Sequence, residues 1–139
     1  MNRRRQKKLS KRLVEAAMFG DPTRVTELLR SGACPRTTDS EGTTPLYAAS
    51  VNGATDNVLR LLAAGALPDT ESGRGTEGTP LCAAACWGHT ETVRALLAHG
   101  ADPNLREDHG TGRTPLEWAM TGPHPETIDA LRAAGAAPR

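Results

Sequence analysis

The sequence predicts an all-α solenoid of four helix–turn–helix repeats, because three short markers recur in one register. Thr-Pro-Leu occurs at residues 44–46, 79–81 and 114–116, and Gly-Ala occurs at 32–33, 65–66, 100–101 and 135–136. The third marker is a glycine at positions 20, 53 and 88. A period of 33 to 35 residues that three markers share is typical of stacked supersecondary units.

Each Thr-Pro pair predicts the start of a first helix. The hydroxyl of Thr44, Thr79 or Thr114 can accept a hydrogen bond from a backbone N–H, and the proline that follows fits the first helical position. The glycine marker then offers a left-handed exit, so that this helix spans only about two turns.

The second helix of each unit carries apolar residues at i, i+3 and i+4, which predict one buried stripe. These residues are Val25, Leu28 and Leu29; Val58, Leu61 and Leu62; and Val93, Leu96 and Leu97. Because only four aromatics are available, small residues must form the contacts between units. The equivalent alanines of the first helices are Ala16, Ala49, Ala84 and Ala119.

The segment from Gly78 to Asn104 closely resembles an ankyrin repeat, since it combines Thr-Pro-Leu, a Gly-His turn, Leu-Leu and Gly-Ala-Asp. The resemblance covers about residues 9–139. It implies a curved solenoid whose first helices and β-hairpin-like finger loops line a concave surface. We expect a basic N-terminal arm over residues 1–12 and an ankyrin-repeat domain over 13–139. The expected repeats are approximately 10–42, 43–77, 78–112 and 113–139.

Two features depart from the family pattern. The family usually carries His two places after the proline, where this chain has Tyr47, Cys82 and Glu117, so we expect the usual Thr–His hydrogen bond to be missing at some cost in stability. Residues 70–77 and 106–113 make two fingers longer by two residues each. Insertions in a solenoid map to one face, which is often the binding face.

The terminal units carry polar residues where the inner units are apolar, which is typical of capping repeats. Glu15 replaces the alanine of the inner first helices, and Arg132 replaces the leucine of the inner second helices. The chain stops after a full final helix, so we expect no appended effector domain.

The formal net charge of +1 is unevenly distributed. Residues 1–12 hold seven of the seventeen Lys and Arg and no acid, whereas the other 127 residues hold ten basic and sixteen acidic groups, a net of −6. An acidic body does not favour a polyanion. The arm leaves three alternatives open: it binds nucleic acid, it contacts an acidic partner, or it is a solvated, frayed helix start. Nucleic-acid binding is the minority interpretation.

Three cysteines, an odd number, favour reduced thiols over a disulfide framework. No stretch approaches the roughly 18 apolar residues of a membrane span, and no apolar signal core follows the basic start. We therefore expect a cytoplasmic protein without membrane association. The preference for Arg over Lys beyond residue 12, with many Ala and Gly, indicates a GC-rich, bacterial genome.

No convincing catalytic constellation or phosphate-binding loop is present, so we expect no enzyme activity and no cofactor. The sharpest alternative is a metal site at Cys82, Cys86 and His89, which lie at i, i+4 and i+7. The simpler interpretation is that Cys82 replaces the family histidine as a partly buried residue. His89 is then the usual turn histidine.

The resemblance also implies where a partner binds, because the last two residues before the first-helix glycine face the groove in this family. These pairs are Met18-Phe19, Val51-Asn52 and Cys86-Trp87. Exposed aromatics mark contact patches; alternatively, Phe19 packs under the arm and Trp87 against a finger. We expect Trp87 and Tyr47 on the groove floor and polar finger edges at Asp39, Ser40, Glu41, Glu71, Ser72, Arg74, Glu107, Asp108 and His109. The predicted function is a monomeric, non-enzymatic adaptor, scaffold or inhibitor that binds another protein.

Overall fold

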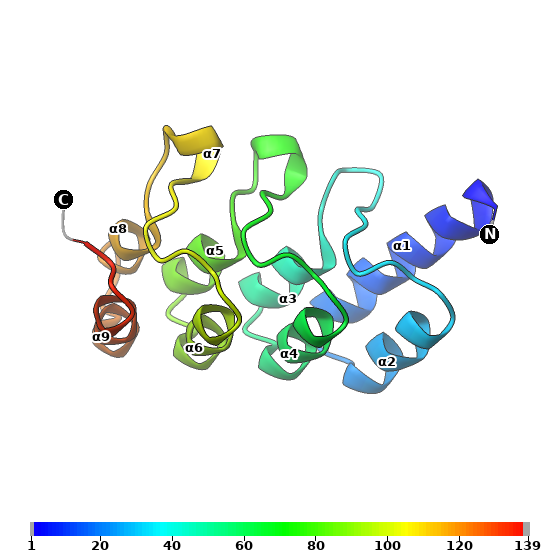
Figure 1. Ribbon diagram of the computed structural model, residues 1–139, viewed down its shortest axis with the longest axis horizontal. Coiled ribbons are helices and arrows are strands. Elements are labelled where there is room, and N and C mark those ends of the chain that lie inside the picture. Colours follow the sequence, from blue (N-terminus) through cyan, green and yellow to red (C-terminus); the bar gives the residue numbers. More distant parts are fainter. Residues whose placement is uncertain (1, 138–139) are drawn as a thin grey trace.

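A computed structural model describes residues 2–137, and four helix pairs make up most of this part of the chain (Figure 1). The pairs are α1 (Arg3–Met18) with α2 (Pro22–Arg30), α3 (Pro45–Val51) with α4 (Thr55–Ala63), α5 (Pro80–Cys86) with α6 (Thr90–Ala98), and α8 (Pro115–Ala119) with α9 (Pro125–Ala133). Two short helical turns, η1 (Gly73–Gly75) and α7 (Glu107–Gly110), lie in loops. The expected all-α class is confirmed.

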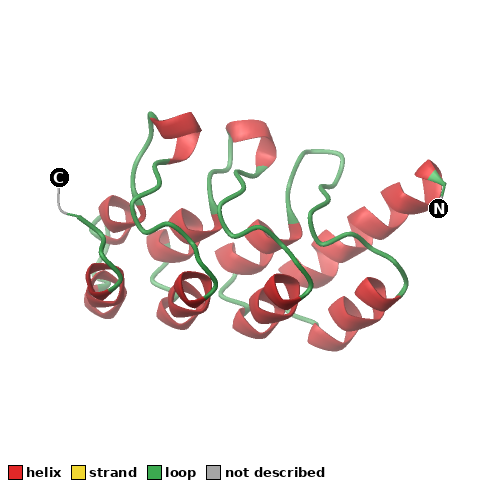
Figure 2. Cartoon of the chain, viewed as in Figure 1, coloured by secondary structure: helices red, strands yellow, loops and turns green. Residues whose placement is uncertain are grey.

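The helix pairs stack in chain order. The first helices α1, α3, α5 and α8 contact one another in succession, and the second helices α2, α4, α6 and α9 form a parallel row. The loops that join the pairs project from one side of the stack (Figures 1 and 2). We call these loops the first finger (residues 31–44), the second finger (64–79) and the third finger (99–114).

The helices begin where the sequence markers predict. The hydroxyls of Thr44, Thr79 and Thr114 accept hydrogen bonds from the backbone N–H three residues on, at 3.1, 3.2 and 3.1 Å, and a proline follows each threonine. The marker glycines at positions 20, 53 and 88 have φ of 72°, 66° and 71°. The left-handed exits are therefore confirmed.

Small and branched aliphatic side chains fill the core, and no aromatic residue is buried in the described part of the chain. The four equivalent alanines of the first helices are buried, which lets neighbouring helices approach closely. The predicted stripe of the second helices is buried at its first two positions in all three units. At the third position Leu62 is buried, but Leu29 and Leu97 are only partly buried.

The expected boundary between arm and domain falls inside a helix. Asn2 caps α1 by accepting the N–H of Arg5 at 2.7 Å, and the helix continues without a break to Met18. Neither glycine nor proline occurs before residue 18, so nothing interrupts the helix. Leu9 is buried, and the hydroxyl of Ser10 lies 2.6 Å from that of Thr37. The second half of the expected arm therefore packs on the domain.

The fingers differ from the expected hairpins. Within residues 2–137 the only β-type pairing is an isolated antiparallel bridge between Ser72 and Gly78. The tips of the two longer fingers instead form the helical turns η1 and α7, where Arg74, Asp108 and His109 have φ between 54° and 57°. The extra residues are used to close a compact turn at each tip.

Candidate functional site

The first helices and the two longer fingers line an open pocket of about 260 Å³. Three aromatic side chains line it: Tyr47 from α3, Trp87 at the end of α5, and Trp118 from α8. Trp87 is 64% exposed, whereas Tyr47 and Trp118 are half-buried. The pocket thus joins three consecutive helix pairs.

Carboxylates from the finger tips line the same pocket. They belong to Glu77, Glu107 and Asp108. Glu107 is only 9% exposed, and its Oε1 accepts a hydrogen bond from Trp118 Nε1 at 2.6 Å. Burial raises the pKa of the Glu107 carboxyl above its usual value, although the Trp118 hydrogen bond acts in the opposite direction. Burial, followed by the charges of Glu77 and Glu107, raises the pKa of Tyr47 to about 12, so its hydroxyl stays neutral.

Hydrogen bonds connect neighbouring fingers into a row. The hydroxyls of Thr43 in the first finger and Ser72 in the second both donate to Glu77 Oε1, at 2.8 and 2.9 Å. The backbone N–H of His109 in the third finger donates to Glu71 Oε1 at 2.8 Å. The three tips are therefore fixed relative to one another.

Three of the expected contact residues, Asp39, Glu71 and Arg74, already bond within this row. Asp39 Oδ1 accepts two backbone N–H groups of its own finger at 2.9 and 3.0 Å. Arg74 Nη2 donates to a backbone carbonyl of the first finger at 3.3 Å. Four expected finger residues are exposed and make no side-chain hydrogen bond to a backbone group within residues 2–137: Ser40, Glu41, Asp108 and His109. The imidazole of His109 lies 3.6 Å from Glu71 Oε2.

The expected groove residues do not all meet in one place. Cys86 and Trp87 line the pocket, whereas Phe19, Val51 and Asn52 do not. Phe19 is 79% exposed at the end of α1, so it does not pack under the helix start. The side-chain amide of Asn52 donates to a carbonyl of its own helix at 3.0 Å.

Trp118 is a pocket residue that the sequence reasoning missed. It occupies the place in α8 where α3 and α5 carry Ala48 and Ala83. The guanidinium carbon of Arg113 lies 4.8 Å from the centroid of its ring. The sequence does carry a signal for this residue, because the equivalent position is alanine in the two inner units and a large aromatic in the last one.

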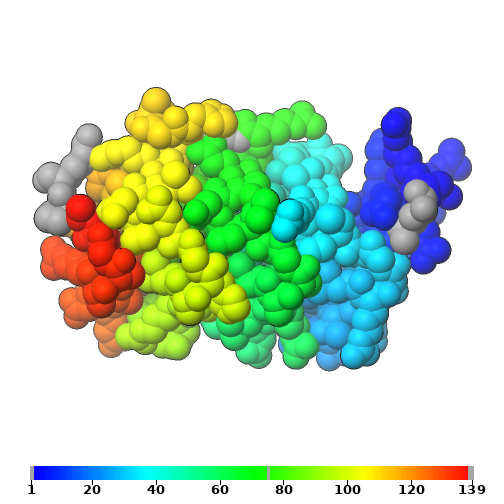
Figure 3. All heavy atoms as spheres, in the orientation of Figure 1, coloured from blue at the N-terminus to red at the C-terminus, as the bar shows by residue number. Residues whose placement is uncertain are grey.

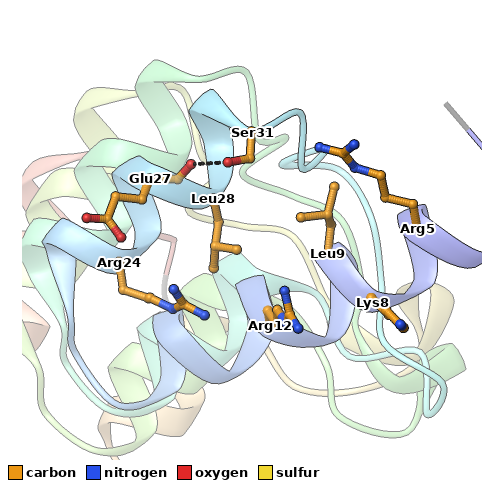
Figure 4. A pocket seen from close by; sticks show the side chains of 8 residues that line it. All are labelled: Arg5, Lys8, Leu9, Arg12, Arg24, Glu27, Leu28 and Ser31. Carbon is orange, nitrogen blue, oxygen red and sulfur yellow. Dashed lines mark hydrogen bonds between the residues drawn. The ribbon is translucent and has the colours of Figure 1, made fainter.

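A second hollow, of about 330 Å³, lies between α1 and α2 at the N-terminal end of the stack (Figure 4). Four cationic side chains surround it, from Arg5, Lys8, Arg12 and Arg24. Leu9 and Leu28 give it an apolar part, and Glu27 is its only acid among the described residues. We call this hollow the basic cleft. A larger cleft of about 860 Å³ separates the other side of α1 from the first finger, where the helix start stands out from the body in Figure 3.

The family model described as ankyrin repeats (3 copies) matches residues 13–107 and, in a second placement, residues 67–139. The two matches together span nearly the whole chain. The chain belongs to the ankyrin-repeat family. Ankyrin repeats are generally protein–protein interaction modules, and proteins that contain them are typically non-enzymatic. None of the described helices is long and apolar enough to span a membrane.

The structure shows what replaces the usual ankyrin histidine in the first helices. In α8 a capping box replaces the usual Thr–His hydrogen bond. The N–H of Thr114 donates to Glu117 Oε1, and the N–H of Glu117 donates to the Thr114 hydroxyl, both at 3.1 Å. At Cys82 the thiol donates to the carbonyl of Arg113 at 3.6 Å, which links α5 to the third finger. Tyr47 instead lines the pocket that Trp87 and Trp118 also line.

The alternative of a metal site at Cys82, Cys86 and His89 is not supported by the geometry. Cys82 is 2% exposed, and its thiol donates to the carbonyl of Arg113 in the third finger at 3.6 Å. His89 Nε2 donates to the carbonyl of Val51 in the preceding ankyrin unit at 3.0 Å. Within residues 2–137 no three His, Cys, Asp or Glu side chains are placed to hold a metal ion.

Proposed function

We propose that this ankyrin-repeat protein is a non-enzymatic adaptor, scaffold or inhibitor that holds a protein partner in the groove between its first helices and fingers. The observation that carries the proposal is the exposure of Trp87, 64%, at the mouth of the aromatic pocket. Exposed tryptophan is over-represented among the residues that dominate binding energy at interfaces. We further propose that the protein acts as a monomer in the cytoplasm.

The finger row supports this function through rigidity. Bonds from Thr43 and Ser72 to Glu77, and from His109 to Glu71, hold the tips in place before a partner arrives. A preorganised surface loses less conformational entropy on association than mobile loops do. The groove can therefore bind with a modest contact area.

Affinity capture with variants tests the proposal. Wild-type protein, Trp87→Ala, Phe19→Ala and the control Leu59→Ala are each used to capture proteins from the source cell, and mass spectrometry identifies what differs. Leu59 is 40% exposed on α4, which belongs to the other helix row, and so matches the loss of apolar surface outside the groove. A protein captured by wild type and by Leu59→Ala but not by Trp87→Ala supports the groove. Capture that depends on Phe19 alone moves the site to the end of α1, and equal capture by all four contradicts the proposal.

The basic cleft favours a second function, binding of an acidic protein segment at the N-terminal end. In Figure 4, Arg5, Lys8 and Arg12 follow one side of α1, and Arg24 faces them from α2. No ion pair of these four side chains with a carboxylate exists in the described residues. The net charge of −6 beyond residue 12 argues against a long nucleic acid.

Binding measured at several salt concentrations distinguishes an acidic protein segment from nucleic acid as the partner of the basic cleft. An acidic peptide should bind with an affinity that falls with ionic strength, and a triple Arg5→Gln, Lys8→Gln, Arg12→Gln variant should lose this binding. Filter binding of DNA and RNA at low salt is measured in parallel, because several phosphate contacts give a steep dependence of the affinity on salt. Binding of nucleic acid without binding of the peptide would contradict the acidic segment and indicate nucleic acid as the partner.

A further inference from the structure

The pocket between Trp87 and Trp118 has the dimensions of a site for one side chain. Its volume of about 260 Å³ lies below the roughly 300–1,000 Å³ of pockets that enclose drug-sized ligands. Gly78 and Ala83 contribute almost no side-chain volume to its wall. A Cβ atom at Gly78 would collide with Glu107 Oε2, so the glycine gives the Glu107 carboxylate room to reach the pocket.

The charged residues in the wall of this pocket are all acidic. Glu77, Glu107 and Asp108 line it, and none of the described residues in its wall is Lys, Arg or His. The carboxylates of Glu77 and Glu107 accept hydrogen bonds only from uncharged donors, two hydroxyls and an indole N–H, in the described residues. Hydrogen bonds of this kind orient a carboxylate but leave its charge uncompensated.

Arg113, the cation that lies over the Trp118 ring, does not neutralise the pocket. Arg113 lies over the Trp118 ring but is not part of the pocket wall, and its effect on Glu107 is the weakest of those that act on that carboxyl. Burial, Asp108 and Glu71 outweigh it, and the pKa of Glu107 stays above its usual value. Arg113 occupies one face of the Trp118 ring, and this contact shows that the ring attracts a guanidinium.

We propose that the pocket receives the guanidinium or ammonium group of an arginine or lysine side chain of the protein partner. The proposal rests on the groove function given above and adds the chemistry of the partner, a basic segment. Aromatic faces attract cations through the negative potential of the ring. Carboxylates bind the N–H groups of a cation by charge-assisted hydrogen bonds. An acidic side chain would be repelled, and an aliphatic one would leave Glu107 more deeply buried without a counter-charge.

NMR titration of the indole N–H signals of Trp87 and Trp118 tests this proposal. The probes are N-acetyl-arginine amide and N-acetyl-citrulline amide, which have nearly the same shape but differ in charge. The expected result is a saturable shift with the arginine probe, weakened by salt, and at least about tenfold weaker binding of the citrulline probe. Equal shifts with both probes, or none with either, would overturn the proposal.

Two variants and one control show whether the carboxylates are responsible. Glu107→Gln keeps an acceptor for the Trp118 indole but removes the charge. Asp108→Asn removes a charge from an exposed position and should leave the fold intact. Both should weaken the arginine probe. Glu126→Gln removes an exposed carboxylate of α9 and should leave it unchanged. Equal weakening by all three variants would mean that only the overall charge matters, which contradicts a specific site.

Failure of the proposed cation site can be distinguished from failure of the proposed groove function. If partner capture depends on Trp87 but neither probe shifts the indole N–H signals, the cation site is contradicted and the groove function is still supported. Indole shifts that grow with protein concentration in the absence of a probe, and that disappear in Arg4→Gln, Arg5→Gln, would show that α1 of a second copy supplies the cation. That result would overturn the assignment to a different protein.

Discussion

His89 donates a hydrogen bond from Nε2 to the backbone carbonyl of Val51, 3.0 Å away in the preceding helix pair. His124 makes the same bond one pair later, to the carbonyl of Cys86 at 3.1 Å. Each imidazole therefore connects the turn of its own unit with the end of the first helix before it. These bonds connect consecutive units, as do the hydroxyl pairs Thr55–Thr92 and Thr90–Thr127 between the second helices, in a stack whose core is aliphatic.

Replacement of His89 by alanine should lower the free energy of unfolding by about 1–2 kcal/mol, because the half-buried Val51 carbonyl loses its donor. Urea denaturation followed by circular dichroism measures the change. His99→Ala is the matched control, since His99 is exposed and should change the stability by less than about 0.5 kcal/mol. Equal losses in the two variants would contradict the structural role of His89.

Gly53→Ala should cost more than about 1 kcal/mol, because Gly53 has φ of 66° and a Cβ there would lie 2.6 Å from Nδ1 of His89. Part of the cost comes from this contact with the imidazole. In the His89→Ala background, the same glycine substitution should therefore cost less, with a coupling of at least about 0.5 kcal/mol in a double-mutant cycle. Strict additivity would show that backbone strain alone is responsible.

Trp87→Ala should leave the free energy of unfolding within about 0.5 kcal/mol of wild type, because the side chain is 64% exposed. It should weaken binding of the partner by about 2 kcal/mol or more, as expected of a residue that dominates an interface. Chemical denaturation and calorimetric titration give the two values. A variant that unfolds much more easily would show that Trp87 is structural.

Cys82 should resist alkylation in the folded protein while Cys34 reacts. Cys82 is buried, and its pKa rises from 9.0 to about 12, which lowers the thiolate fraction at neutral pH by about 1,000-fold. Cys34 is exposed. Iodoacetamide labelling, read out by peptide mass spectrometry in the native protein and in urea, checks the difference. Comparable native rates for the two thiols would be inconsistent with the buried position.

The ionised Glu107 should make the protein less stable as the pH rises. Because burial raises the pKa of this carboxyl above 4.5 in the folded state, the folded chain binds more protons than the unfolded chain between the two pKa values. The free energy of unfolding therefore falls with increasing pH across that window and is constant above it. Glu107→Gln should remove this contribution, which urea titrations at several pH values can measure. A pH dependence identical in wild type and variant would be evidence against it.

The repeat could be predicted from sequence because its markers act locally. Thr79, for example, caps its helix whatever surrounds it, and a glycine with positive φ ends the helix at the same place in each unit. The helical tips of the longer fingers could not be foreseen, since their shape depends on bonds between fingers. Arg74 and His109 adopt left-handed conformations in tips that are tied to the neighbouring finger.

The candidate site was only partly predictable for a related reason. Trp87 was found because it precedes the marker glycine, but Trp118 reaches the same pocket from the next unit. Which finger residues stay free also depends on tertiary partners: Asp39 and Glu71 are acidic in the sequence like Asp108, yet their carboxylates accept backbone N–H groups. Spacing along the chain carries no information about such pairings.

The linear stack has a consequence for motion. The main contacts of each helix pair are with its immediate neighbours, so the terminal pair α8–α9 can open while the others remain folded. A ligand held between Trp87 and Trp118 bridges α5 and α8 and opposes this opening. Occupancy of the pocket would then be recorded as slower amide hydrogen exchange in α9, a helix that makes no contact with the ligand itself.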